Sequence, residues 1–235
     1  MMQITQIRKL SLWIFFIPFL SINFCLLISV NFNVLENTIF SVDQIGRSDF
    51  TIPYLDGSLS ISRASRTFPQ YLVFKPAMIF TSIVLIFYWV KTNNLIKSFL
   101  YSDKNFIFRT WGILSAVFLS VHSILLGVDF EIEIIKLLKR VFLIGFILAE
   151  ITAQASLVFH FYKFREKVSN YYHPKVLNLK ILLISLLILI ALITVPFLMD
   201  EKNVHLKHGL EWNYFIGIIT FYLLTFFFWK EEKST

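Results

Sequence analysis

The sequence predicts an all-α, polytopic membrane protein, a bundle of six transmembrane helices with a long first outward loop. Apolar residues make up 57% of the 235 residues and charged residues only 16%, whereas soluble domains carry about 25% charged residues. Six runs of roughly 20 apolar residues have no polar face and are long enough to cross a bilayer as helices. The short apolar-polar alternation of membrane strands is missing. We therefore expect one membrane domain covering residues 1–235.

Short charged connectors separate the expected spans. The first run exceeds the roughly 7–15 apolar residues of a signal peptide and has no clear cleavage site, so we favour a retained span over a leader. The connection that follows it is polar and rich in turn-forming residues, which predicts a loop outside the bilayer. The expected spans are residues 10–30, 71–90, 110–128, 141–162, 181–198 and 212–229, and the outward loop is residues 31–70.

The basic residues are distributed unevenly between the two sides of the expected bundle. The termini and the connectors after the second and fourth spans hold 13 Lys/Arg and 4 Asp/Glu, whereas the other side, including Lys75, holds 9 and 10. Positive connectors remain in the cytosol, so this bias predicts cytosolic termini in an integral, multi-pass protein. It also explains the overall charge of +7 without a nucleic-acid partner.

Glu150 is the strongest single candidate for a functional residue, because a carboxylate in the middle of a membrane span is energetically costly and usually has a function. Gln154 lies four residues further on and shares its helical face. One interpretation is a polar site for a headgroup, a proton or an ion. The other is a structural role, in which Glu150 is bonded to a neighbouring helix.

The histidines are only weak candidates for metal or haem ligands. His122 and His160 could ligate a haem between helices, but their expected depths place them near opposite ends. His205 and His208 are a weak metal pair, because a zinc site usually needs three or four ligands. His122, His205 and His208 with Asp129 would serve an intramembrane hydrolase only if they converge. No metal or other cofactor is expected, and the single Cys25 excludes an intramolecular disulfide.

The outward loop carries Arg63 and Arg66 among several serines. Arginine side chains bind phosphate or carboxylate groups with two parallel hydrogen bonds, which would suit a lipid headgroup. Ordinary surface arginines are the competing interpretation. Asp56-Gly57 in the same loop is a turn-forming pair.

Several short motifs lie in the first loop and in or beside the expected spans: Pro53 to Asp56, Phe68-Pro69, Gly112 to Ser115, Asp129-Phe130 and Glu211-Trp212. Their order along the chain resembles the FRAG/DRAM/SFK family of six-span membrane proteins. The resemblance rests on a long first loop, on short motifs in and after the third span, and on a Glu-aromatic pair opening the sixth. Leu138-Lys139-Arg140 departs from the family pattern, which has a histidine-bearing element before the fourth span.

The resemblance implies a membrane-lipid context and no particular reaction. The leading hypothesis is a protein involved in membrane-lipid organisation, lipid or GPI-anchor remodelling, or lipid-linked signalling, with membrane lipids and other membrane proteins as partners. A transporter or proton-coupled carrier centred on Glu150 is the first alternative, and the hydrolase is the second. The headgroup candidates are Asp56, Arg63, Arg66, Glu211 and Trp212, with the first loop packed over the bundle near Glu211 and Asp129; the intramembrane polar candidates are Glu150, Gln154 and His122.

Overall fold

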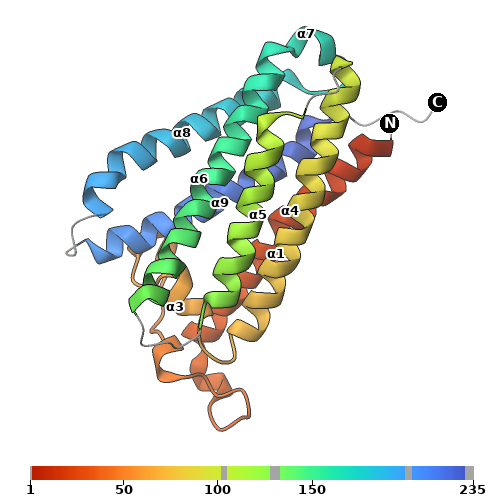
Figure 1. Cartoon of the computed structure of the whole chain (residues 1–235). Coiled ribbons are helices and arrows are strands. Elements are labelled where there is room, and N and C mark those ends of the chain that lie inside the picture. The colour runs from red at the N-terminus through yellow and green to blue at the C-terminus, as the bar shows by residue number, and fades with distance from the viewer. Residues whose placement is uncertain (1, 102–104, 128–132, 199–202, 231–235) are drawn as a thin grey trace.

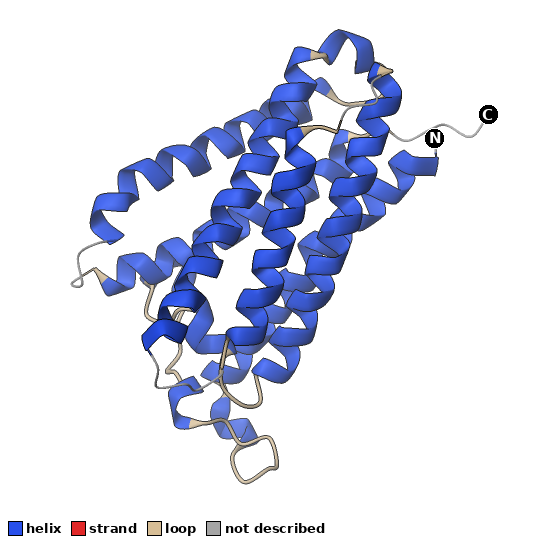
Figure 2. Cartoon of the chain, viewed as in Figure 1, coloured by secondary structure: helices blue, strands red, loops and turns tan. Residues whose placement is uncertain are grey.

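The computed structural model describes residues 2–101, 105–127, 133–198 and 203–230, and this part of the chain is helical without strands (Figures 1 and 2). Six helices are long and apolar enough to cross a membrane. The expected six-helix, multi-pass membrane fold is confirmed. These helices are α1 (Met2–Val30), α4 (Tyr71–Leu100), α5 (Ile107–Leu125), α6 (Glu133–Lys163), α8 (Pro174–Leu198) and α9 (Val204–Phe228).

Most of the six helices extend beyond the apolar runs that predict them. The connector expected at 91–109 continues α4 as far as Leu100, and the polar turn expected before residue 212 is helical from Val204 onwards. Hydropathy detects only the part of a helix that lies in hydrocarbon, because charged residues are accepted beyond it. Pro174 opens α8 seven residues before the expected start, at the first helical position that proline favours.

The six helices form a ring in which each packs against its neighbours. α1 contacts α4 and α9, α5 lies between α4 and α6, and α8 lies between α6 and α9. Figure 1 shows that α1 begins and α9 ends at the same end of the bundle, here called the terminal end. The opposite end, which carries residues 31–70, is called the loop end.

The connection between α1 and α4 folds into four short helices at the loop end. They are η1 (Phe32–Leu35), η2 (Gln44–Gly46), α2 (Pro53–Asp56) and α3 (Ile61–Ser65). α3 packs against α1 and α9, so the loop covers the bundle as expected (Figure 1). A further short helix, α7 (Arg165–Val168), lies at the terminal end.

Aromatic side chains fill the interior on the terminal side of the bundle. Tyr88 and Trp89 of α4 are fully buried and pack edge to face with each other and with Tyr222 of α9. Gly112 of α5 allows the Trp89 ring to approach closely, because a Cβ at this position would overlap the indole. This half of the bundle is therefore solidly packed, which contrasts with the loop half.

Candidate functional site

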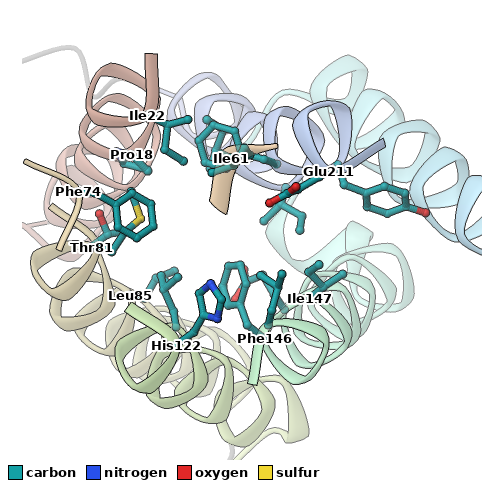
Figure 3. Close-up of a pocket in the computed structure, with 18 of the residues that line it drawn as sticks. Pro18, Ile22, Ile61, Phe74, Thr81, Leu85, His122, Phe146, Ile147 and Glu211 are labelled. Carbon is teal, nitrogen blue, oxygen red and sulfur yellow. The ribbon is translucent and has the colours of Figure 1, made fainter. Parts of the chain in front are cut away.

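An apolar cavity occupies the loop half of the bundle. It leaves about 90 Å³ for the centres of water-sized molecules, within about 800 Å³ of space that protein atoms do not fill and that is partly open to the surroundings. α1, α3, α4, α5, α6 and α9 all contribute to its wall. Figure 3 shows apolar side chains such as Ile22, Phe74 and Leu85 around this space, with His122 and Glu211 directed into it. The cavity extends along α9 from Glu211 to Tyr222. These residues are 11 positions apart, which corresponds to about 16 Å of helix.

Glu150 lies at the inner end of the cavity and is fully buried. Its carboxylate accepts hydrogen bonds from the Ser115 hydroxyl at 2.5 Å, from the Gln154 amide at 3.0 Å and from the Tyr222 hydroxyl. The Gln154 amide also donates to the backbone carbonyl of Ile218 at 3.2 Å. Glu150 therefore joins α5, α6 and α9, and the expected pairing of Glu150 with Gln154 is present.

Glu211 lies at the loop end of the cavity, beneath α3. Its carboxylate accepts from the backbone N–H of Ser62 at 3.3 Å and lies against the N–H of Ile61. These groups belong to the first turn of α3, whose backbone N–H groups have no partner within the helix. The Ser60 side chain caps the same turn by accepting from the Arg63 N–H. Glu211 thus fixes α3 over the cavity.

His122 faces the cavity from α5 and is only 7% exposed. Its Nδ1 lies 3.1 Å from the backbone carbonyl of Lys139 on α6. A carbonyl can only accept, so Nδ1 carries the proton of this bond. In the neutral ring, Nε2 is then an acceptor.

The loop is bonded to α9 through three side chains of that helix. His208 Nδ1 donates to the Gly57 carbonyl at 3.0 Å, Trp212 Nε1 donates to the Leu59 carbonyl at 2.7 Å, and Asn213 donates to the Tyr54 carbonyl at 2.9 Å. Gly57 has a φ of +59°, a conformation that glycine adopts without strain. A Cβ at Gly57 would also overlap the backbone of α9 at His205, so both conformation and space require glycine.

Asp56 organises its own turn instead of facing a ligand. Its carboxylate accepts from the Ser58 N–H at 2.9 Å, the Thr51 hydroxyl at 2.9 Å and the Ile52 N–H at 3.1 Å. The hydrogen bond from the Ser58 backbone, with those from Thr51 and Ile52, lowers the pKa of the Asp56 carboxyl to about 2. These bonds favour the charged form.

The Asp56 turn is expected to loosen in acid. Because its pKa falls from 3.8 to about 2 on folding, Asp56 stabilises the turn above pH 3.8 and this contribution disappears as the pH falls towards 2. Hydrogen exchange of residues 51–58, corrected for intrinsic rates, should therefore accelerate over this range. Asp56→Asn should exchange rapidly at both ends of the range. Asp49→Asn, a change at an exposed aspartate of the same loop, should behave as wild type; equal behaviour of the two variants would contradict the role of Asp56.

The five headgroup candidates differ in exposure, because those of the loop lie on the surface whereas Trp212 is buried. Arg63 and Arg66 are exposed, and the Arg63 Nε donates to the Ile45 carbonyl at 3.1 Å. Trp212 is fully buried and packs edge to face on Tyr54 at 4.8 Å between ring centroids. In the described part of the chain, no hydrogen bond or ion pair links either arginine side chain to Asp56 or Glu211. Asp129 lies outside the described residues.

Lys180 is a buried residue that the sequence analysis missed. The charge count assigned it to a basic connector; instead it lies inside α8 and is 1% exposed. Its Nζ donates to the Thr225 hydroxyl at 2.6 Å and lies 3.9 Å from the centre of the Phe221 ring. None of the described carboxylates forms an ion pair with it. Pro174 opens α8 six residues before Lys180. A proline at the start of a helix is the signal in the sequence that could have placed Lys180 inside α8.

The remaining histidines do not converge on a metal. Among the described residues, no three His, Cys, Asp or Glu side chains are grouped as metal ligands would be. His205 is exposed, while His208 bonds to the loop and His122 to α6. His160 Nδ1 bonds to the Ser156 carbonyl at 2.7 Å, and its ring packs on Phe106 and Phe108. Of the residues of the hydrolase hypothesis, the described His122, His205 and His208 are therefore not grouped together as metal ligands, and Asp129 lies outside the described residues.

These contacts define a membrane helix bundle with an apolar cavity that α3 covers. A carboxyl group lies at each end of this cavity. No family model, curated protein or solved structure matches the chain.

Proposed function

We propose that this protein binds a membrane lipid or similar amphiphile in the cavity of the loop half. The observation that carries the proposal is the apolar cavity, which extends for about 16 Å along α9 inside the membrane-spanning part of the bundle. Ligand sites in proteins are typically apolar with a few placed polar groups. An acyl chain is the apolar ligand that a bilayer supplies.

The packing around Glu150 favours binding over transport. Three donors already satisfy its carboxylate, and the fully buried Tyr88 and Trp89 fill the interior beyond it. A carrier needs access to its site from both sides of the membrane. A transporter centred on Glu150 is therefore the less favoured function, because Glu150 lies at the closed inner end of the cavity.

The contacts give physical roles to two motifs of the FRAG/DRAM/SFK resemblance. Gly112 admits the Trp89 ring and Ser115 binds Glu150. Glu211 and Trp212 together hold the first loop. These roles support a proposal that the chain shares the lipid-related function of that family, in membrane-lipid organisation, GPI-anchor remodelling or lipid-linked signalling. Other membrane proteins would be its further partners.

We also propose that both termini are cytosolic. Without the buried Lys180, the termini and their connectors still carry a net charge of +8, against −1 on the loop side, counting Lys75. The loop end and its cavity would then face outwards or into a lumen. Labelling of single cysteines placed in residues 31–70, in a Cys25→Ala background, with a membrane-impermeant reagent tests this orientation.

Leu119→Trp is expected to prevent lipid binding by filling the cavity. Leu119 lines this space, so the larger indole occupies the room that a chain needs. The test is to grow cells on a photoactivatable, alkyne-tagged fatty acid, which enters many lipid classes, and to map the crosslinked peptides. Wild type should be labelled at cavity-lining positions such as Met78 and Phe215, and Leu119→Trp should lose this labelling.

Leu192→Trp is the matched control, because Leu192 is 69% exposed on α8 and does not line the cavity. This variant should keep the cavity labelling, and both variants should keep the labelling of exposed helix faces by surrounding lipid. Wild-type protein labelled only on exposed faces would contradict the proposal.

A further inference from the structure

Three of the four described hydroxyl groups that line the cavity already donate within the protein. The Thr81 hydroxyl donates to the Ala77 carbonyl at 2.8 Å, and the Tyr214 hydroxyl donates to the Leu187 carbonyl at 2.5 Å. Tyr222 donates to Glu150. Among the lining hydroxyls, this leaves only that of Ser62, which can rotate to donate or to accept.

At the loop end of the cavity, the side-chain atoms of Glu211 and His122 that can still bond to a ligand are hydrogen-bond acceptors. Glu211 accepts from the first turn of α3, but a carboxylate offers about four lone-pair positions, so others remain. His122 supplies Nε2 as an acceptor in its neutral form, since Nδ1 is held by Lys139. Both side chains are directed into the space in Figure 3. With Glu211 ionised and His122 neutral, a ligand group placed between them is one that donates hydrogen bonds.

Among the described residues that line the cavity, there is no lysine or arginine. Arg63 and Arg66 are exposed, and the Lys75 ammonium donates to the Ile124 carbonyl at 3.4 Å. A phosphate or carboxylate group would meet an ionised Glu211, and the described lining residues include no lysine or arginine to compensate the two negative charges. Like charges in a site of low dielectric repel strongly, so the wall selects against anions.

We propose that the cavity binds a single-chain amphiphile whose headgroup is an amine or a hydroxyl, held at Glu211 and His122, with its chain directed towards Glu150. This inference rests on the proposed lipid-binding function and adds the chemistry of the headgroup. It replaces the phosphate recognition that Arg63 and Arg66 suggest in the sequence.

The test is competition against the photolabelled fatty acyl chains, using the full-length protein in nanodiscs. The competitors are tetradecylamine, tetradecanol and tetradecyl phosphate, which share one chain and differ in the headgroup. The amine and the alcohol should displace the label from cavity peptides at concentrations about tenfold or more below those of the phosphate, a difference of about 1.4 kcal/mol. Labelling of exposed helix faces serves as the internal reference.

Glu211→Gln should weaken displacement by the amine about tenfold and leave displacement by the alcohol within about twofold, because the amide keeps an acceptor and loses the charge. Glu36→Gln, a change in the exposed part of the loop, should behave as wild type. His122→Phe, which removes the other acceptor without disturbing Glu211, should weaken displacement by both the amine and the alcohol.

Equal displacement by all three competitors, or preference for the phosphate, would overturn the headgroup proposal and leave lipid binding intact. Cavity labelling that is absent in wild type, or unchanged in Leu119→Trp, would instead remove the lipid-binding proposal itself.

Discussion

Replacing Glu150 by alanine is expected to lower the free energy of unfolding by about 1–3 kcal/mol. Three buried donors would lose their acceptor. Two of them, on Ser115 and Tyr222, lie on other helices, and interhelical hydrogen bonds in membranes contribute about 0.6–1.7 kcal/mol each. Glu150→Gln should cost less, about 1 kcal/mol, because its carbonyl still accepts. Thermal unfolding in detergent micelles, followed as loss of monodisperse protein, measures the difference.

Glu166→Ala is the matched control for this substitution, since Glu166 lies in α7 and is exposed. It should unfold within about 0.5 kcal/mol of wild type, as surface substitutions usually do. A Glu150→Ala variant as stable as the control would show that the carboxylate does not hold α5, α6 and α9 together. Stability close to wild type combined with a loss of lipid labelling would favour a functional role for Glu150.

Replacing Trp212 by alanine is expected to release the first loop from α9. The indole is fully buried, donates to the Leu59 carbonyl at 2.7 Å and packs on Tyr54. Truncation of a buried tryptophan costs about 3–5 kcal/mol through lost burial and the space left behind. The cost should fall mainly on the loop, because α2 and α3 are short and depend on this contact.

Limited trypsin digestion measures this release, because Arg63 and Arg66 lie in the segment that Trp212 secures. Cleavage at these arginines should accelerate strongly in Trp212→Ala and remain slow in Trp13→Ala. Trp13 is a suitable control because it is 56% exposed on α1. Equal cleavage rates would show that the loop stays closed without the indole.

The sequence predicted the membrane helices well because the bilayer constrains them directly. Each span must satisfy its own backbone hydrogen bonds in hydrocarbon, so every long apolar run becomes a helix. Helix ends were predicted less well, as Val204 of α9 and Pro174 of α8 show. Outside the hydrocarbon, helix ends depend on capping and packing instead of hydropathy.

The candidate site was only partly predictable from the sequence. Glu150 and Gln154 are four residues apart on one helix, so their pairing follows from local geometry. Ser115 and Tyr222 come from distant segments, and nothing in the spacing of the sequence indicates that they reach Glu150. Lys180 was misplaced for a related reason, since its burial depends on how α8 lies against α9.

By itself, the sequence determined that this protein is a six-helix membrane bundle with a polar first loop, because hydropathy and local turn chemistry act within a few residues. Only the tertiary structure decided that the loop half encloses a cavity, that Glu211 holds α3 over it, and that Arg63 and Arg66 lie on the exposed surface. These features depend on which helix faces meet across the ring. That choice is made by side chains far apart in the chain, through packing and hydrogen bonds that have no counterpart in local sequence.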